Sequence, residues 1–459
     1  GTQSRLTAQV LPATLPRLVG TRFQVLFHSA PAVKTTDSGL KLNGTTSYAA
    51  TTGPVIDTRA SYTVAAWVRM DTPTRNATVF GQNGVNRSPF YLGYEHTSKK
   101  WSFREVNTDA AVGTPFSYQR VESKNPAVPM VWTHLAGVFN AADNTISLYV
   151  NGELQGTTPF TTAWAATGAL QIGRVHWSST YTDYFPGVID EAAVWQEALT
   201  GTQIAQESAL PDADGKASVE LVAAWNPAGA QGTSLPDGVS GYGRALALAS
   251  GASLTDEGLV LDGTAGAGTT PGPVVDDSGS FTVTAQALVD GAKLLTKPNG
   301  YKAQVLGQRT ATGSSWSLWF EKTGTKQEEE FDENGDPVID ENGDFKTITV
   351  PVGRWHFGRL TADGSGASVQ SMEEALVDTE TRLTGVYNAQ DRTIQLYLTS
   401  DQQTSDGIAY TAQAGTGELA VGKGYLGSWA NFLPGRLSDI RLWAGALSDS
   451  EQVSEVVGT

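Results

Sequence analysis

The carboxylates that come closest to a catalytic spacing lie in the run Glu330-Phe-Asp-Glu333. Hydrolysis of a glycosidic bond requires two carboxyl groups that face each other, about 5 to 9 Å apart. A strand would turn Glu330 and Asp332 to one face, but the run lies among Asn, Gly and Asp residues that favour turns. We therefore expect a solvated acidic loop. Asp190 and Glu191 are adjacent, so a strand would turn them to opposite faces.

Other catalytic motifs are absent from the sequence. It contains no cysteine, no Gly-x-Ser-x-Gly, no His-Glu-x-x-His and no complete phosphate-binding Gly-x-x-x-x-Gly-Lys-(Ser/Thr) motif. Its five histidines are not spaced as metal ligands. The sequence therefore predicts a protein that is not an enzyme, and a glycan hydrolase or lyase is the alternative with the least support.

Aromatic residues in loops are the better candidates for a functional site. A sugar stacks its C–H face on an aromatic ring, while polar side chains around the ring form hydrogen bonds. The loop 176–184 is rich in such side chains, and Trp177 is expected to contribute most to binding and little to stability. The predicted ligand-binding residues are Tyr94, His176, Trp177, Tyr181 and Tyr184, together with Trp429 in a corresponding later loop.

The elements that would position these residues occur in two copies. Residues 187–199 recur as residues 435–447, and each copy runs from alternating apolar residues into the capped start of a short helix. Early motifs recur 219 residues apart (Gly44 and Gly263), whereas late motifs recur 248 residues apart (Asp143 and Asp391). The second copy is therefore longer by 29 residues, the difference between 248 and 219.

Most of the extra length falls at residues 322–350, which contain two Asp-Glu-Asn-Gly-Asp runs. Asn-Gly favours type I′ turns, in which both central residues have positive φ. We predict an acidic insert of one or two protruding β-hairpins. Removal of residues 322–349 is expected to leave the second copy folded, because surface hairpins tolerate such changes.

Short apolar stretches between Gly, Asn and Asp residues predict an all-β protein with two tandem antiparallel β-sandwich (jelly-roll) domains. Domain 1 is expected over residues 1–210, with residues 1–22 as the remnant of a preceding segment, and domain 2 over residues 211–459. A first strand of domain 2 is expected over residues 219–225. The residues predicted to be buried are Trp67, Val138, Ile146, Leu148 and Trp195 in domain 1, and Val283, Val386, Ile394, Leu396 and Trp443 in domain 2.

Four motifs carry a family resemblance. They are Leu-x-Leu-(Asn/Asp)-Gly, Ser-(Tyr/Phe)-Thr-Val-x-Ala-Trp at residues 61–67, Trp-Thr-His-Leu-Ala-Gly-Val-Phe at residues 132–139, and the closing Gly-x-Ile-Asp-Glu-x-x-Val-Trp. With these motifs both copies resemble the laminin-G-like (LamG) jelly-roll modules of the concanavalin A-like lectin/glucanase superfamily, in the tandem form found in large secreted actinobacterial proteins. The second copy departs from the pattern, with Gln286 for Trp67 and Arg382 for His134.

The resemblance also implies a metal site, because in the family fold the first and last strands are neighbours. That arrangement would bring Asn43 near Asp190, and Asp262 near Asp439. Carboxylate and amide oxygens near glycine turns are common calcium ligands, so calcium is a candidate cofactor. Hydrogen bonding within turns and edge strands is the alternative role for these residues.

The charge and composition of the chain argue against some classes of binding partner. A net charge of -16 and the absence of any basic stripe argue against nucleic-acid binding and against docking on anionic membranes. No apolar run is long enough to insert into a membrane. We expect a non-enzymatic recognition or adhesion segment of a larger secreted, extracellular protein, with a glycan or another cell-surface ligand as its partner. The alternative is a scaffold that docks on a partner protein or holds a toxin, adhesin or enzyme module.

Overall fold

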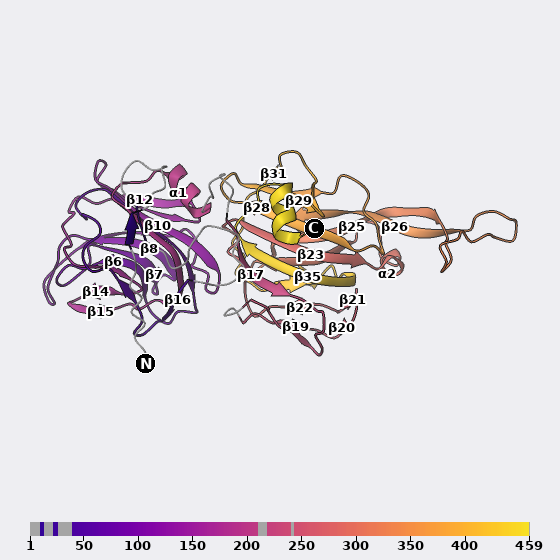
Figure 1. Cartoon of the computed structure of the whole chain (residues 1–459), viewed down its shortest axis with the longest axis horizontal. Coiled ribbons are helices and arrows are strands. Elements are labelled where there is room, and N and C mark those ends of the chain that lie inside the picture. Colours follow the sequence, from indigo (N-terminus) through magenta and orange to yellow (C-terminus); the bar gives the residue numbers. More distant parts are fainter. Residues whose placement is uncertain (1–9, 13–21, 26–38, 210–217, 240–242, 459) are drawn as a thin grey trace. The chain divides into compact units, whose positions relative to one another are not determined.

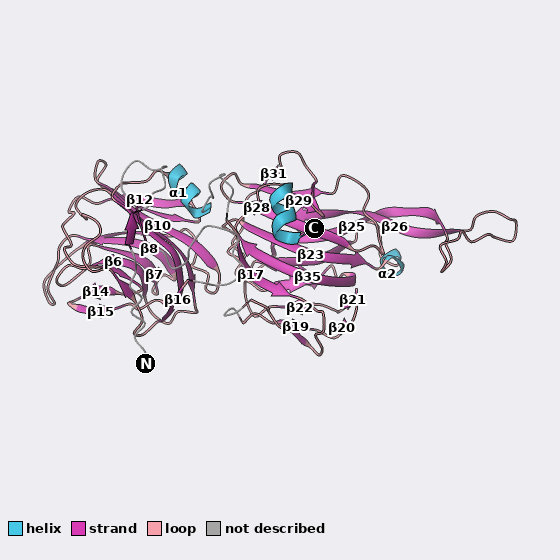
Figure 2. Ribbon diagram, viewed as in Figure 1, coloured by secondary structure: helices cyan, strands magenta, loops and turns pink. Residues whose placement is uncertain are grey.

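The computed structural model describes residues 10–12, 22–25, 39–209, 218–239 and 243–458. The chain divides into two compact units, Gly1–Ser218 (unit 1) and Val219–Thr459 (unit 2) (Figure 1). The predicted boundary between residues 210 and 211 lies outside the described residues. Strands dominate both units, and every described strand pair is antiparallel within its sheet, as predicted (Figure 2). In the described residues no helix is long and apolar enough to span a membrane.

Unit 1 is a sandwich of two sheets. Its first sheet has the order β1-β2-β16-β5-β10-β11-β12, and β3 also pairs with β16. Its second sheet has the order β4-β13-β6-β7-β8-β9, and β14 and β15 form a separate hairpin. The strands of the first sheet are β1 (Val10–Pro12), β2 (Arg22–Val25), β3 (Leu40–Asn43), β5 (Tyr62–Met70), β10 (Trp132–Asn140), β11 (Thr145–Val150), β12 (Glu153–Pro159) and β16 (Pro186–Trp195). The other strands are β4 (Ala49–Ala50), β6 (Ala77–Gln82), β7 (Phe90–Glu95), β8 (Lys100–Val106), β9 (Tyr118–Glu122), β13 (Leu170–Ile172), β14 (Val175–Trp177) and β15 (Thr180–Thr182).

Strands β1 and β2 belong to the first sheet of unit 1, because β1 pairs with β2 and β2 pairs with β16. The sequence predicts residues 1–22 to be a remnant of a preceding segment. Two parts of the N-terminal region, Val10–Pro12 and Arg22–Val25, are instead integrated into the sandwich. The remainder of residues 1–22 lies outside the described residues.

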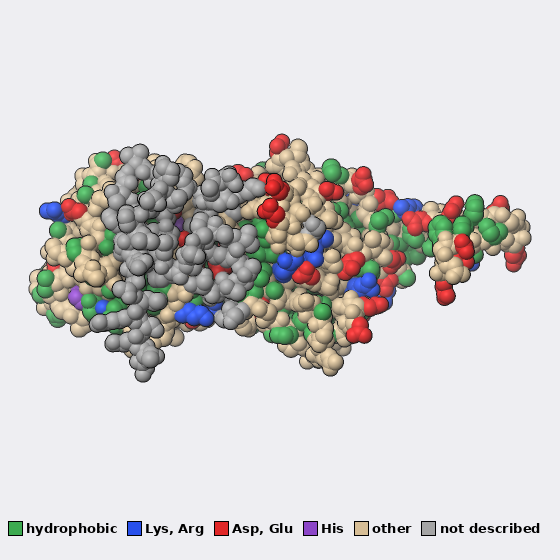
Figure 3. All heavy atoms as spheres, viewed as in Figure 1, with side chains coloured by type: hydrophobic (Ala, Val, Ile, Leu, Met, Phe, Trp, Pro, Cys, Tyr) green, Lys and Arg blue, Asp and Glu red, His purple; other side chains and the backbone are tan. Residues whose placement is uncertain are grey.

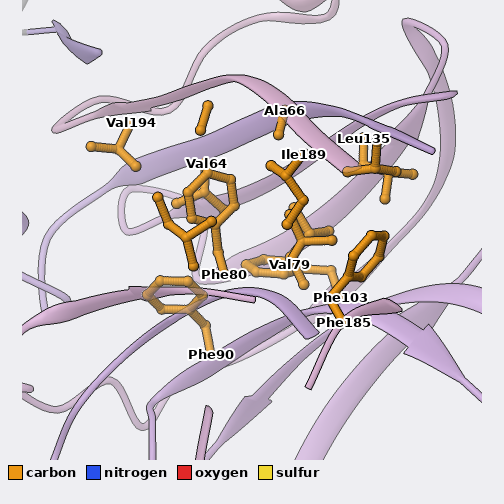
Figure 4. Packing of buried hydrophobic residues seen from close by; sticks show 14 of the residues in the cluster. Val64, Ala66, Val79, Phe80, Phe90, Phe103, Leu135, Phe185, Ile189 and Val194 are labelled. Atoms are coloured by element: carbon orange, nitrogen blue, oxygen red, sulfur yellow. The ribbon is translucent and has the colours of Figure 1, made fainter. Parts of the chain in front are cut away.

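The core of unit 1 lies between its two sheets, where side chains of alternate strand positions meet. Figure 4 shows Val64 and Ala66 of β5 and Ile189 of β16 packed against Phe80, Phe90 and Phe103 of the second sheet. The opposite face of the first sheet is covered by α1 (Gly201–Ala209). Ile204 of this helix packs with a second apolar group, which contains Val138, Trp195 and Leu199.

The predicted buried residues of unit 1 are confirmed with one exception. Val138, Ile146, Leu148 and Trp195 are at most 5% exposed. Trp67 is only half-buried, since alternation along β5 turns it away from the core. It lies instead beside His134, with ring centroids 5.4 Å apart.

Unit 2 repeats the sandwich. Its first sheet has the order β20-β21-β35-β23-β28-β29-β30, with β17 on β35 and β31 on β29, and its second sheet has the order β18-β19-β22-β32-β24-β25-β26-β27. The strands of the first sheet are β17 (Glu220–Trp225), β20 (Ala252–Thr255), β21 (Gly258–Asp262), β23 (Phe281–Val289), β28 (Thr381–Asn388), β29 (Thr393–Leu398), β30 (Asp401–Gln402), β31 (Ile408–Ala409) and β35 (Pro434–Ala444). The others are β18 (Ser234–Leu235), β19 (Leu246–Leu248), β22 (Gly268–Thr269), β24 (Lys302–Arg309), β25 (Ser314–Glu329), β26 (Thr347–Gly358), β27 (Ser368–Gln370), β32 (Leu419–Val421), β33 (Gly424–Tyr425) and β34 (Trp429–Ala430), and the helices are α2 (Gly291–Leu295), α3 (Ser450–Val453) and the π-helix η1 (Ser454–Gly458).

The predicted core of unit 2 is confirmed. Val283, Val386, Ile394, Leu396 and Trp443 are at most 3% exposed. The first predicted strand of domain 2 corresponds to β17. The predicted helix after the closing strand also forms, and its N-cap is Asp449, whose side chain accepts a hydrogen bond from Gln452 N.

The insert of unit 2 is an arm built on a long hairpin, in which β25 and β26 extend beyond the sandwich (Figure 1). Its two Asp-Glu-Asn-Gly-Asp runs close turns in which Asp332 accepts from the backbone N–H groups of Asn334 and Asp336, and Asp340 from those of Asn342 and Asp344. In each turn only the glycine has positive φ, 78° at Gly335 and 84° at Gly343. The hairpins are as predicted, but the turns are not type I′.

Candidate carbohydrate-binding surface

The predicted loop 176–184 forms a two-stranded hairpin, β14–β15. Ser178 and Ser179 at its turn have φ values of 54° and 68°, as a type I′ turn requires. His176 and Tyr181 are directly opposite each other, and their ring centroids are 4.1 Å apart. The hairpin is fixed to the loop before β7, because Ser179 N donates to Asn86 O over 2.8 Å. The hairpin that carries the ring pair is therefore anchored to that loop.

A cation supports the Tyr181 ring. The guanidinium carbon of Arg174 lies 3.3 Å from the ring centre of Tyr48 and 3.4 Å from that of Tyr181, so the flat group must lie between the two rings. Its Nε donates to Gln171 Oε1 over 2.8 Å. Asn83 Nδ2 donates to the Tyr181 hydroxyl over 2.8 Å, yet 36% of Tyr181 remains exposed. Tyr181 is thus an oriented ring at the surface.

Trp177, which follows His176 in β14, is part of a packed cluster. The guanidinium carbon of Arg87 lies 4.3 Å from its ring centre, and that of Arg104 lies 4.9 Å away. The rings of Tyr91 and Phe116 meet it edge-on, with centroids 5.4 and 5.3 Å away. Arg87 is 3% exposed, and its backbone is fixed by the carboxylate of Asp109. These contacts favour a stabilising role for Trp177, in contrast to the expectation that it contributes little to stability.

Two other predicted ligand-binding residues do not join the ring pair. Tyr94 belongs to the core cluster of unit 1, 6% exposed, because β7 turns it inward opposite Trp101. Its hydroxyl contacts His96 Nδ1 at 3.2 Å. Tyr184 is half-buried in the segment between β15 and β16. Of the predicted set, the structure brings together His176 and Tyr181, whereas Trp177 is opposite Thr180 on the same hairpin and packs in a separate cluster.

Unit 2 also carries a ring pair on a corresponding hairpin, but its rings meet edge-on, at 72°, whereas those of unit 1 are tilted by 36°. In the hairpin β33–β34, Tyr425 is directly opposite Trp429, with ring centroids 5.0 Å apart. Lys423 Nζ lies 3.9 Å from the Trp429 ring centre, and the guanidinium carbon of Arg309 lies 4.1 Å from that of Tyr425. Glu418 forms an ion pair with Arg309 Nε at 2.5 Å. Both Tyr425 and Trp429 are half-buried.

The electrostatics of this second hairpin are those of a partly dehydrated site. Burial lowers the pKa of Lys423 below its ordinary value, although the Glu418 carboxylate opposes the shift. For Glu418, burial would raise the pKa, but the hydrogen bond from Arg309, a backbone hydrogen bond and the charges of Arg309 and Lys423 together outweigh it, and the pKa is lowered. Glu418 is therefore a carboxylate at neutral pH.

The predicted metal ligands do not gather. Asn43 is opposite Pro186 on β16, whereas Asp190 is opposite Trp67. Pro186 and Asp190 are four positions apart on β16, which corresponds to about 13 Å, so Asn43 and Asp190 are not close together. Asn43 Oδ1 accepts from the backbone N–H groups of Thr45, Thr46 and Ser47. In unit 1 the turn role is therefore the one that the geometry supports.

The predicted metal ligands of unit 2, Asp262 and Asp439, do not gather either. Asp262 is opposite Pro434, and its Oδ1 accepts from the backbone N–H groups of Thr264, Ala265 and Gly266. Asp439 instead forms ion pairs with Arg382 at 2.7 Å and Arg441 at 2.8 Å. Among the described residues no three His, Cys, Asp or Glu side chains gather as a metal site. The residues present do not fit the calcium site that the resemblance implies.

The adjacent pair Asp190 and Glu191 also differs from expectation. The pairing of β16 with β5 shifts between Asp190 and Ala193, and Glu191 has a φ of 50°. This β-bulge replaces the simple alternation that predicts opposite faces. Both residues are buried, at 1% and 6% exposure. Unit 2 has the same bulge, with a φ of 45° at Asp439.

Sequence reasoning missed the cations beneath the rings. Arg174 follows Gly173 directly, and Lys423 follows Gly422 at the same place in the second copy. A basic residue shared by both copies just before the predicted loop was the available signal. Tyr48, Asn83 and Arg309 gave no such signal, because they come from distant parts of the sequence.

Residues 43–205 match the family model described as the concanavalin A-like lectin/glucanases superfamily. Solved structures that resemble the chain include a heptameric SAP-like pentraxin from Limulus polyphemus, at 16% identity over 39% of this chain and 80% of that one, with a TM-score of 0.28. A Ruminococcus gnavus IT-sialidase CBM40 bound to α2,6-sialyllactose also matches, at 16% identity over 39% of this chain and 100% of that one, with a TM-score of 0.29.

Domain 4 of AbnA, a GH43 extracellular arabinanase from Geobacillus stearothermophilus, in complex with arabinotriose, matches at 13% identity over 52% of this chain and 98% of that one, with a TM-score of 0.31. No curated protein matches the chain. The family match covers most of unit 1 and includes the hairpin β14–β15. Unit 1 thus contains a laminin-G-like domain of the concanavalin A-like lectin/glucanase superfamily, over residues 43–205.

Proposed function

We propose that the chain is a non-catalytic carbohydrate-recognition segment, with one glycan-binding surface at the hairpin of each unit. The observation that carries the proposal is the repeated ring pair beside a cation. Unit 1 presents His176 and Tyr181, and unit 2 presents Tyr425 and Trp429. Two copies that differ in ring type and ring angle but keep a ring pair beside a cation are better explained by binding than by packing alone.

In each hairpin a neighbouring side chain holds a ring in place before any ligand binds. A ring that is already held in place loses little conformational freedom when a sugar stacks on it. Arg174 and Asn83 hold Tyr181, and Lys423 lies against Trp429. A tryptophan offers a larger stacking surface than a tyrosine. The two units should therefore prefer different glycans.

The proposal assigns no catalytic role. The carboxylates closest to a catalytic spacing, Glu330 and Asp332, are on the arm of unit 2, where Asp332 caps its own turn. Glu418, beside the second ring pair, forms an ion pair with Arg309. A recognition or adhesion role in a larger secreted protein is consistent with the acidic, cysteine-free composition.

The test is binding of the intact chain to an array of neutral and acidic glycans, followed by titration of each hit. The double variant Tyr181→Ala and Trp429→Ala should lose binding. Phe345→Ala is the matched control, because Phe345 is an exposed aromatic residue on the arm, 54% accessible. If no glycan binds, or if the double variant binds as well as the native chain, the proposal fails and a scaffold role takes its place.

A further inference from the structure

The tip of the arm branches from its stem at a closed ring of three backbone hydrogen bonds. Glu330 N donates to Lys346 O, Lys346 N to Val338 O, and Val338 N to Glu330 O, each over 2.8 Å. From this ring two short hairpins branch off, closed by the bridges Phe331 to Pro337 and Ile339 to Phe345. Every member of the ring is both donor and acceptor, so the branch point is a defined structure.

Apolar side chains lie exposed on one face of this tip. Phe331, Ile339 and Phe345 are 57%, 53% and 54% exposed, and Pro337 is exposed beside them. Directly opposed residues of an antiparallel pair share a face, and Pro337 and Ile339 flank the same residue, Val338. The four side chains therefore form one apolar patch. Ile348, 42% exposed, is paired with Glu328 and is turned to the opposite face of the stem.

Carboxylates surround the patch (Figure 3). Residues 326–346 contain nine acidic side chains and two lysines, which gives a net charge of -7 (2 minus 9). The two lysines are paired with carboxylates, Lys326 with Glu328 at 3.1 Å and Lys346 with Glu330 at 3.4 Å. An exposed apolar patch within a polar rim is typical of a binding site for another protein.

We propose that this patch docks a partner protein whose surface combines an apolar depression with a rim of Lys and Arg. The charge of the arm selects this class of partner, because opposite charges attract it from solution and like charges exclude others. The same argument disfavours a second copy of the chain, since its net charge is -16. Phe331 and Phe345 would be the anchors, because buried aromatic side chains commonly dominate interfaces.

The proposal is tested by selecting 12-residue peptides from a random phage-displayed library on the immobilised intact chain. Peptides that also bind a chain lacking residues 327–349 are removed first. We expect the selected peptides to combine Lys or Arg with apolar residues. Synthetic copies should lose at least tenfold in affinity for the triple variant Phe331→Ser, Ile339→Ser, Phe345→Ser. They should keep native affinity for the control Ile348→Ser, which removes an exposed apolar side chain from the opposite face.

Added salt provides the second readout, because the acidic rim should make binding weaken as ionic strength rises. Selection of no arm-dependent peptide, selection of acidic peptides, or equal binding to the triple variant would each overturn the proposal. Sedimentation of the native chain as a dimer that the triple variant abolishes would overturn it in favour of a second copy. A melting curve of the triple variant that matches the native one confirms that the sandwich of unit 2 is intact.

Discussion

The guanidinium of Arg174 covers one face of the Tyr181 ring at 3.4 Å. Tyr181→Ala should therefore weaken glycan binding by unit 1 at least tenfold, about 1.4 kcal/mol. Tyr181→Phe keeps the ring but loses the hydrogen bond from Asn83, so its affinity should fall only a few-fold. Titration calorimetry with the best glycan from the array measures both. Equal affinity of the alanine variant and the native chain would show that the glycan-binding site is not at this hairpin.

Trp177 should behave in the opposite way. Its ring packs against Arg87, Arg104, Tyr91 and Phe116, so Trp177→Ala opens a cavity and removes one of the aromatic partners of each guanidinium group. We expect a loss of about 2–4 kcal/mol in the stability of unit 1. Trp177→Phe should cost less. Urea denaturation measures the change, and a loss below about 1 kcal/mol would mean that the cluster is not a stabilising one.

A buried carboxyl group should make the stability of unit 1 depend on pH. The Tyr62 hydroxyl donates to Glu105 inside the core, and burial raises the pKa of Glu105 to about 8. In the unfolded chain the carboxyl ionises near its ordinary pKa of 4.5. The folded state binds the proton more tightly, so stability is fully present below pH 4.5 and is lost as the pH rises towards 8.

Glu105→Gln removes this dependence while keeping a partner for Tyr62. The melting temperature of the native chain, relative to that of the variant, should fall between pH 5 and pH 8. Taking the difference between the two chains cancels other groups, among them Asp277, whose pKa burial raises to about 7, and His134, whose pKa burial lowers to about 3. Parallel pH profiles for the two chains would show that Glu105 ionises normally in the core.

Removal of the arm should leave unit 2 folded if the cut is placed correctly. Lys326 and Val350 are directly opposite each other, so a two-residue Asn-Gly turn can replace residues 327–349. We expect the melting temperature to change by less than about 3 °C. The deletion that the sequence suggests, residues 322–349, should be far more damaging. Lys322 is 4% exposed, and its Nζ donates to Lys297 O over 2.6 Å.

Calcium should have little effect on the described fold. Asn43 and Asp262 already accept hydrogen bonds from their own turns, and Asp439 is paired with two arginines. The melting temperature should therefore be the same in millimolar calcium and in chelator. An increase of several degrees with calcium would reveal a site that these residues do not explain.

The fold could be predicted because the sequence motifs that specify the sandwich occur twice. Matching spacings identify the copies, and alternation along strands identifies core residues such as Val283 and Leu396. The same alternation explains the error at Trp67, which is at an outward position of β5. Alternation identifies the face of a sheet, but it does not reveal what covers that face.

The site was less predictable because its supports are remote in sequence. Arg87 lies over Trp177 although the two are 90 residues apart (177 minus 87), and nothing near either residue indicates the contact. The sequence predicts a loop where the structure has a hairpin, because Ser-Ser is not a typical pair for a type I′ turn. By contrast Tyr181 and Trp429 could be predicted, since they are aromatic residues in presumed loops, where the alternation of a core strand does not explain them.

The two strands of the stem are paired at its base, where Lys326 is opposite Val350. Unit 2 can therefore accept inserted sequence at this point. Material added beyond that pair changes neither the order of the strands nor the distance that the chain must bridge. An insertion site of this kind lets the arm change in sequence or length during evolution while selection on the sandwich residues is unaffected. It also offers an engineer a place to graft an epitope or a small domain without redesigning the host.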